Sequence, residues 1–301
     1  MSKKLTVKDL YQLKGKKKLV SILVKNVEEA RAANKVGFEM LATGSPGLYK
    51  NPDKHPEFDE IIKIRNAAPN AFMHWGAADT LYSGIIEATR VAFKALEHGI
   101  DMFYCHNNFD LINGLYKQGI PGLGHVGLVP SRRTWTGGFK AVGKNAEEAI
   151  NIYEQCIKIQ DAGGVAIEME CVPFKVAEAI TKKVEPIVVS MGSGPGCDAE
   201  FLFGCDILGI TEGHIPRHAK MYRNFQDEFK RLQNERENAF KEFYDDVQSG
   251  SFPEKKHILN IEEKELDIFL NNLEKLSKLK TKRFQKISGQ HLLSWPLFMK
   301  C

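Results

Sequence analysis

The sequence lacks two kinds of hydrophobic segment. No run approaches the roughly 18 apolar residues that span a membrane, and residues 1–10 lack the apolar core of a secretory signal. Closely spaced cysteines are also missing, because the six cysteines lie far apart without a CxxC pair. Reduced thiols are therefore expected rather than a disulfide framework or a zinc knuckle. These absences predict a cytoplasmic protein with no membrane partner.

Neither sign of charge dominates the chain. Its 42 basic and 38 acidic residues leave a net charge of +4, and the basic residues are spread out apart from 16–18 and 275–286. Such short runs usually form solvated faces, so no nucleic-acid partner is expected. With 43% hydrophobic residues in 301, the chain is long enough for one (β/α)₈ domain and an appendage.

Short apolar runs alternate with amphipathic stretches at the spacing of βα units. This alternation predicts an α/β fold, a closed (β/α)₈ TIM barrel, with a doubly wound open sheet as the alternative. The predicted helices include 27–35, 85–98, 146–161 and 174–183. The predicted strands are 19–24, 39–43, 71–76, 102–106, 122–125, 165–170, 187–190 and 207–210.

After Ile210 the pattern changes to long, highly charged helices over about 220–249 and 261–279. A turn signal with Gly250 and Pro253 separates them. We expect a barrel catalytic domain over 1–255 and a C-terminal helical extension over 256–301. The extension is expected to pack on the barrel or on a neighbouring subunit.

One predicted strand ends on a carboxylate, Glu170, and a glycine-rich turn, Gly192-Ser193-Gly194, follows the next strand. The C-terminal ends of barrel strands are where (β/α)₈ enzymes place catalytic groups, and a late glycine-rich turn often holds an anion. These features predict an enzyme. Cys105 and Cys171 stand beside predicted strand ends, and we interpret both as inert thiols.

Several ordered motifs resemble the ketopantoate hydroxymethyltransferase family over about residues 18–257. The resemblance implies a (β/α)₈ barrel of the phosphoenolpyruvate mutase and isocitrate lyase superfamily, usually a homodecamer. It also implies transfer of a one-carbon unit from methylene-tetrahydrofolate to 3-methyl-2-oxobutanoate with Mg²⁺. The motifs are Gly124-His125-Val126-Gly127-Leu128-Val129-Pro130, Gly137 to Gly143, Glu168-Met169-Glu170-Cys171-Val172-Pro173, Gly192-Ser193-Gly194 with Cys197-Asp198, Gly213-His214-Ile215-Pro216-Arg217 and Gly250-Ser251-Phe252-Pro253.

The chain departs from the family at the expected metal ligands. Gly44 stands where the resemblance implies the Asp of a Gly-Asp-Ser motif, and an ungapped alignment puts Gly76 at a second Asp. Tyr104 and His106 stand in place of the lysine and glutamate of a Lys-x-Glu motif. A hard dication needs anionic oxygen ligands, so the family Mg²⁺ site is predicted to be lost. Little or no ketopantoate synthesis is expected.

The general base and the substrate pocket are predicted to persist. The family equivalent of Glu170 removes a C3 proton from the 2-oxo acid, and the equivalent of His125 lies in the substrate pocket. We expect Ser45 and the turn Gly192-Ser193-Gly194 to bind substrate, and Tyr104, His106 or an arginine to stabilise an enolate oxygen. The alternative for Glu170 is a structural hydrogen-bond acceptor.

Histidines could have replaced the lost ligands. Side chains alternate along a strand, so Gly76 facing the barrel axis implies that His74 faces it too, and Tyr104 shares a face with His106. His74 and His106, with His125 and Glu170, could hold a transition metal such as Zn²⁺ or Fe²⁺. The alternative for His74 is a hydrogen-bonded histidine of the core. The cofactor is otherwise unknown.

Arg132 and Arg133 follow the predicted fifth strand, where the family usually has uncharged residues. A guanidinium binds carboxylate in bidentate fashion, so either could anchor the substrate. The alternative is a solvated or interface pair. We therefore predict an enzyme that acts on a small 2-oxo or related carboxylic acid by Glu170-assisted proton abstraction and aldol-type carbon–carbon chemistry. The rival is a catalytically inactive barrel that serves as a binding or assembly subunit.

Overall fold

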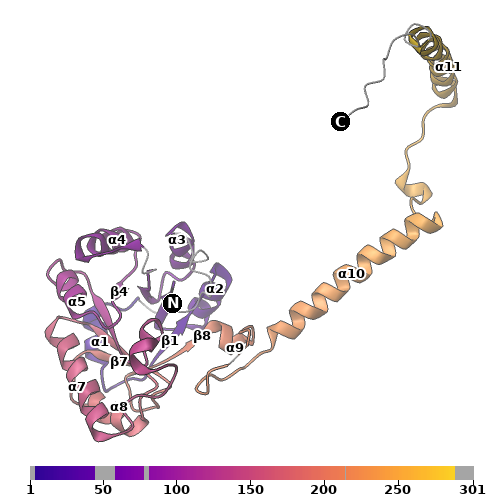
Figure 1. Cartoon of the computed structure of the whole chain (residues 1–301). Coiled ribbons are helices and arrows are strands. Elements are labelled where there is room, and N and C mark those ends of the chain that lie inside the picture. The colour runs from indigo at the N-terminus through magenta and orange to yellow at the C-terminus, as the bar shows by residue number, and fades with distance from the viewer. Residues whose placement is uncertain (1–3, 45–57, 78–80, 214, 289–301) are drawn as a thin grey trace, which may run out of the picture. The chain divides into compact units, whose positions relative to one another are not determined.

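The computed structural model describes residues 4–44, 58–77, 81–213 and 215–288. The chain divides into two compact units, residues 1–229 and 230–301. The first unit is built around a parallel sheet, and the second consists of helices (Figure 1).

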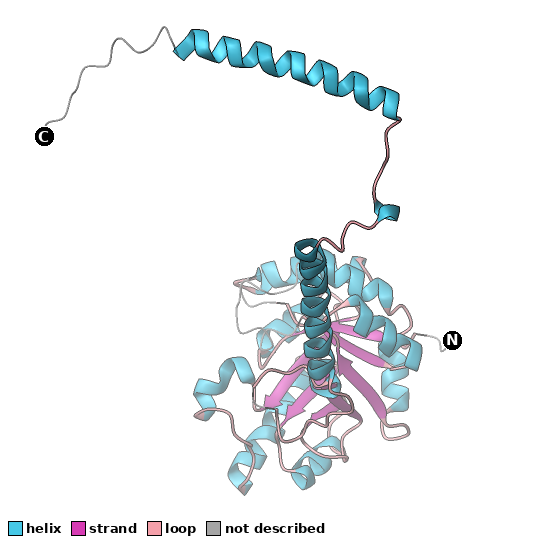
Figure 2. Cartoon of the chain, turned by 90° about the vertical axis from the view of Figure 1, so that its right-hand side faces the viewer, coloured by secondary structure: helices cyan, strands magenta, loops and turns pink. Residues whose placement is uncertain are grey.

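Eight parallel strands close into a barrel in the order β1 to β8. The strands are magenta in Figure 2. Closure is direct, because Ile22 of β1 pairs with Leu41 of β2 on one side and with Leu202 of β8 on the other. The (β/α)₈ prediction is confirmed, and the open doubly wound sheet is excluded. The strands are β1 (Leu19–Leu23), β2 (Met40–Thr43), β3 (Phe72–Trp75), β4 (Met102–Tyr104), β5 (Gly122–Gly127), β6 (Ala166–Glu170), β7 (Ile187–Met191) and β8 (Ala199–Phe203).

Helices surround the strands (Figure 2), and some of them begin at side-chain caps. The side chains of Asn26 and Asn145 accept hydrogen bonds from the third backbone N–H of the helices that they precede. The helices of this unit are α1 (Val7–Leu13), α2 (Val27–Val36), α3 (Phe58–Ala67), α4 (Ile85–Glu97), α5 (Phe109–Tyr116), a 3₁₀ turn (Pro130–Arg132), α6 (Arg133–Thr136), α7 (Ala146–Asp161), α8 (Phe174–Thr181) and α9 (Gly204–Leu208).

The predicted eighth strand was wrong. The apolar run 207–210 falls on the end of α9 and the turn after it, and β8 lies earlier in the chain. A four-residue apolar run fits a buried helix as well as a strand. Gly209 ends α9 with φ +66°, which a side chain would adopt only with strain. In β8 the inward residues Ala199 and Phe201 are buried, whereas Glu200 between them is partly exposed.

The apolar core has two layers that the strand alternation separates. In β6, Ala166 belongs to the cluster inside the barrel, whereas Ile167 and Met169 belong to the cluster between the sheet and the helices. Leu10 of α1 is fully buried in the inner cluster. Lys14, just after α1, bonds to the residues that precede β7 and β8, so α1 lies at the N-terminal end of the barrel.

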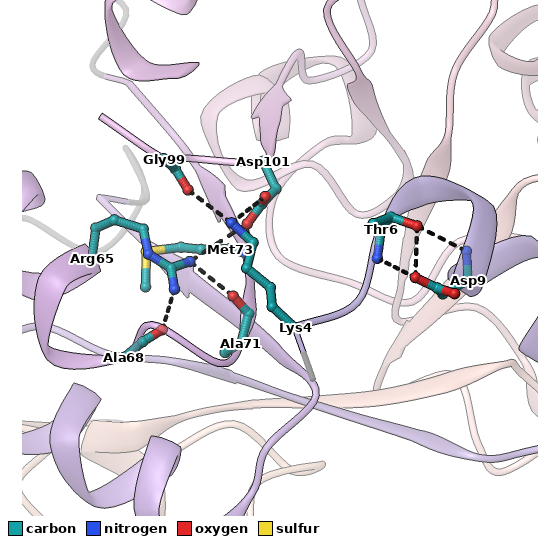
Figure 3. A network of polar contacts seen from close by, with 9 residues as sticks. All are labelled: Lys4, Thr6, Asp9, Arg65, Ala68, Ala71, Met73, Gly99 and Asp101. Atoms are coloured by element: carbon teal, nitrogen blue, oxygen red, sulfur yellow. Dashed lines mark hydrogen bonds and ion pairs between the residues drawn. The ribbon is translucent and has the colours of Figure 1, made fainter. Parts of the chain in front are cut away.

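Polar contacts connect residues at the N-terminal ends of β3 and β4 (Figure 3). The ammonium group of Lys4 lies 2.6 Å from the carboxylate of Asp101, which also accepts a 2.9 Å hydrogen bond from the backbone N–H of Met73. Arg65 is buried, and its guanidinium donates to the carbonyl of Ala71 at 2.8 Å. Burial lowers the pKa of Arg65, and Asp101 partly offsets that effect. These contacts stabilise the N-terminal end of the barrel, the end where TIM-barrel residues serve stability.

The last helices are α10 (Phe225–Ser249) and α11 (Glu263–Ser288), with a 3₁₀ turn (Lys255–His257) between them. Both helices were predicted, with starts two to five residues earlier than the structure shows. Among the described residues, no helix is long and apolar enough to cross a membrane.

Candidate functional site

A cavity of about 860 Å³ opens at the C-terminal ends of the barrel strands. Its walls include Thr43 from β2, Tyr104 from β4, Glu170 from β6, Met191 from β7 and Phe203 from β8. Because each of these residues is the last of its strand or close to it, the cavity occupies the face where TIM-barrel enzymes bind their substrates. The barrel itself therefore positions the site.

Two buried carboxylates stand on the floor of this cavity. Glu168 and Glu170 are two residues apart on β6, so both face the barrel interior. The exposed fraction of the surface is 5% for Glu168 and 7% for Glu170. Sequence analysis singled out Glu170 and missed Glu168. The strand alternation was the signal for Glu168, because an inward Glu170 places residue 168 on the same face.

The imidazole of His125 lies between the two carboxylates. Its Nδ1 is 3.4 Å from Oε2 of Glu168, and its Nε2 is 3.3 Å from Oε2 of Glu170. The hydroxyl of Tyr104 is 2.6 Å from the same Nδ1. The structure therefore brings together three of the predicted site residues, Glu170, His125 and Tyr104, around one buried ring.

The other two predicted histidines also line the cavity. Nε2 of His74 is 3.4 Å from Oε1 of Glu168, so His74 faces the barrel interior as the alternation predicts. His106 follows β4 with φ +54°, and its ring lies edge-on to Tyr104 with the ring centroids 4.5 Å apart. Its Nδ1 lies 3.2 Å from the hydroxyl of Ser131.

These contacts determine the charges at the floor. Burial opposes the charged form of His125, but the carboxylates of Glu170 and Glu168 outweigh it and raise the pKa of His125. Burial likewise opposes ionisation of Glu168, but His74, His125 and His106 outweigh it and lower the pKa of Glu168. The floor thus favours an imidazolium next to carboxylate.

This pairing predicts a pH window of extra stability. The raised pKa of His125 stabilises the fold below its ordinary pKa of 6.5, and the effect is lost as pH rises through the raised value. The lowered pKa of Glu168 stabilises it above 4.5, and that effect is lost as pH falls through the lowered value. The free energy of unfolding, measured with urea, should be higher for wild type than for Glu168→Gln, and the difference should be largest between pH 4.5 and 6.5. A difference that does not change with pH would contradict the pairing.

The residues at the family's metal positions do not fit a dication. Gly44 has φ +67°, and a Cβ placed on it would lie 2.6 Å from Nε1 of Trp75, so the indole occupies the space that a ligating side chain needs. Gly76 lines the cavity without offering a side-chain oxygen. Within the ranges that the structure describes, no three His, Cys, Asp or Glu side chains form a group that could hold a metal ion. The arrangement of the described side chains therefore does not support a metal site formed by His74 and His106.

The glycine-rich turn supports the site from outside the cavity. Ser193 is fully buried, and its hydroxyl donates to the carbonyl of Met169 at 2.7 Å and accepts from the N–H of Val172 at 3.0 Å. Gly192 has φ +70°, and a Cβ on it would lie 2.7 Å from Nδ1 of His218. Gly192, Ser193 and Gly194 are not among the residues that line the cavity, so the structure does not bring this predicted anion site to the carboxylates.

The two predicted arginines face different spaces. Arg133 lines the main cavity, and its guanidinium carbon lies 5.3 Å from the ring centroid of Phe139. Arg132 lines a neighbouring cavity of about 600 Å³ together with Trp135. Ser45, predicted to bind substrate, lies outside the described residues.

Cys171, which directly follows Glu170 in the chain, also lines the cavity. Its φ of +55° is unusual for a residue with a side chain. Burial and the neighbouring Glu170 raise the pKa of its thiol to about 11. Cys171 therefore stays protonated near neutral pH, as expected of an inert thiol, and burial also raises the pKa of Cys105.

Comparisons with known proteins agree with this architecture. The family model described as ketopantoate hydroxymethyltransferase matches residues 63–255. The 3-methyl-2-oxobutanoate hydroxymethyltransferase of Pyrococcus furiosus is 30% identical over 278 residues, covering 87% of this chain and 94% of that protein. The enzyme of the same name from Staphylothermus marinus is 31% identical over 267 residues, covering 85% and 96%.

Among solved structures, the carboxyl transferase domain of Rhizobium etli pyruvate carboxylase with 3-hydroxypyruvate is 9% identical, with a TM-score of 0.50, and the match covers 67% of this chain and 42% of that one. A likeness of this kind shows the fold alone. A 2,3-dimethylmalate lyase, described as a member of the PEP mutase/isocitrate lyase superfamily, is 13% identical, with a TM-score of 0.47 and coverage of 93% and 98%.

Proposed function

Because this chain belongs to the ketopantoate hydroxymethyltransferase family, we propose that it is an enzyme that removes a proton from the carbon beside the oxo group of a small 2-oxo acid or related carboxylic acid. The resulting enolate forms or breaks a carbon–carbon bond in an aldol-type step. Its own reaction differs from ketopantoate synthesis, since Gly44 and Gly76 supply no ligands for the family's dication.

The observation that carries this proposal is the position of Glu170. Its carboxylate is buried at the end of β6, lines the cavity and lies 3.3 Å from the imidazole of His125. A carboxylate held in this way is a general base for a substrate in the cavity. The substrate proton moves to an oxygen of Glu170. The electron pair of the C–H bond forms the new carbon–carbon double bond, and the π pair of the carbonyl moves onto the oxo oxygen to give the enolate.

Hydrogen-bond donors that line the same cavity as Glu170 supply the stabilisation of that oxygen. Tyr104 and His125 lie within 2.6 Å of each other, and His106 contacts the Tyr104 ring. An imidazolium and a phenol in a buried site stabilise a developing negative charge, and they need no rearrangement when it forms. We assign this role to Tyr104, His125 and His106 together.

Deuterium uptake from solvent tests the proposal. The protein is incubated in D₂O with pyruvate, 2-oxopentanoate and 3-methyl-2-oxobutanoate in turn, and the C3 protons are followed by NMR. We expect exchange above the rate without protein for at least one of these acids. Binding of the acids without any exchange would contradict the proposal and favour the inactive barrel as a binding subunit.

We also propose that the protein is a homo-oligomer, with a decamer as the family expectation. Phe240, Phe243, Tyr244 and Val247 recur on α10 at the spacing of one apolar helix face, which is typical of a surface that packs on another chain. Light scattering at micromolar concentration should give a mass several times the chain mass of 33.9 kDa. A species of 33.9 kDa would contradict the assembly.

A further inference from the structure

Three cationic side chains line the loop-built part of the main cavity. Arg133 and Lys140 come from the segment between β5 and α7, and Arg217 comes from the segment after α9. All three are exposed and line the same cavity as Glu168 and Glu170. These three positive charges are therefore on loops, whereas the carboxylates of Glu168 and Glu170 are on strand β6.

The two arginines have no carboxylate already bound to them. Within the described ranges, neither Arg133 nor Arg217 has a carboxylate oxygen within 4.0 Å. Asp206, the other acid that lines the cavity, is 3% exposed and accepts a hydrogen bond from the hydroxyl of Thr211. Lys140 also lines the neighbouring cavity, where Glu148 lies. The arginines are therefore available to an anion that enters from solvent.

The cavity is larger than a short 2-oxo acid requires. Its volume of about 860 Å³ lies near the upper end of the range for sites that hold drug-sized ligands. Leu128, Phe139 and Met191 add apolar wall to it. A ligand that places its oxo group beside Glu170 therefore leaves room for a longer chain within the cavity.

We propose that Arg133 and Arg217 form a subsite for a second anionic group, so that the substrate class is a 2-oxo acid with a carboxylate or phosphate at its far end. This inference rests on the proposed function for the reacting end of the ligand. The oxo group distinguishes the reacting end, because Tyr104 and His125 can receive it at the floor, whereas the arginines attract the far anion. Lys140 adds positive charge to the same cavity.

Calorimetry with two acids of equal length tests the subsite. 2-Oxoglutarate and 2-oxopentanoate each have five carbons and differ in the terminal carboxylate. We expect wild type to bind 2-oxoglutarate at least about tenfold more tightly, as charge-assisted contacts allow. Arg133→Gln and Arg217→Gln should each remove most of this preference and leave the affinity for 2-oxopentanoate within about twofold. The preference should also fall as salt is raised.

Arg31→Gln is the matched control, because Arg31 is exposed on α2 and does not line the cavity. It should keep the full preference. 2-Oxoadipate against 2-oxohexanoate, and phosphonopyruvate against pyruvate, extend the test to a longer span and to a phosphorus anion. Equal affinity for the members of all three pairs would overturn the subsite, as would arginine variants that keep the preference.

Deuterium exchange separates this inference from the proposed function. Exchange of the C3 protons of 2-oxopentanoate without a binding preference for any dianion would overturn the subsite alone. A preference that depends on both arginines, without exchange of any ligand, would uphold the subsite and count against Glu170 as the base.

Discussion

Supplied with 3-methyl-2-oxobutanoate, methylene-tetrahydrofolate and Mg²⁺, the purified protein is expected to form ketopantoate orders of magnitude more slowly than the typical enzyme turnover of about 10 s⁻¹. The reason is the donor set at the C-terminal ends of β2, β3 and β4, where Gly44, Gly76 and His106 offer no carboxylate. Mg²⁺ prefers anionic oxygen ligands in octahedral geometry, which glycine and imidazole do not supply. Ketopantoate is quantified by mass spectrometry over a long incubation.

The Pyrococcus furiosus relative, assayed in the same mixture, is the positive control. Gly44→Asp is the matched variant, and it should not restore synthesis. A side chain at this position would meet the indole of Trp75, and a residue other than glycine would be strained at the positive φ. Turnover near 10 s⁻¹ by wild type would contradict the loss of the metal site.

Glu170→Gln should slow exchange of the C3 protons of a 2-oxo acid by at least about 10²-fold, the lower end for a positioned general base. The amide keeps the shape of the side chain but cannot accept the proton. Affinity for the acid should change little by comparison. The variant should still fold, although with lower stability, because Glu170 also supports the charged form of His125. Exchange rates come from NMR in D₂O at saturating ligand, so that binding and proton transfer are separated.

Glu147→Gln is the control for this variant, because Glu147 is exposed on α7, away from the cavity. It should leave the exchange rate unchanged. If Glu170→Gln also exchanges at the wild-type rate on every acid that binds, then Glu170 is a structural acceptor and the base lies elsewhere.

The barrel could be predicted from the sequence because its strands are short apolar runs at regular spacing. Seven of the eight predicted strands overlap strands of the structure, and 146–161 matches α7 in full. The eighth failed because β8 combines Glu200 with apolar neighbours, whereas the apolar run that starts at Ile207 is the half-buried end of the short helix α9. Local composition does not distinguish these two cases; the closure of the barrel does.

The positions of site residues on strands could be predicted from the alternation of side chains, whereas the positions of site residues on loops could not. Alternation placed His74 and Tyr104 inside the barrel, and the same rule would have found Glu168. Arg132 and Arg133 line different cavities because Arg132 ends a short 3₁₀ turn and Arg133 begins α6. The burial of Ser193 depends on its contact with β6. Such tertiary contacts leave no periodic pattern in the sequence.

In the mechanism that we propose, Glu170 removes the proton and the hydrogen-bond donors Tyr104, His125 and His106 stabilise the enolate, without the family's dication. The most direct measurement is deuterium uptake at C3 of a 2-oxo acid by protein treated with a chelator and checked for metals by mass spectrometry. The proposal predicts that exchange by wild type persists in metal-free protein and that Glu170→Gln loses it. Exchange that disappears with the chelator and returns only when Mg²⁺ or a transition metal is added would contradict it.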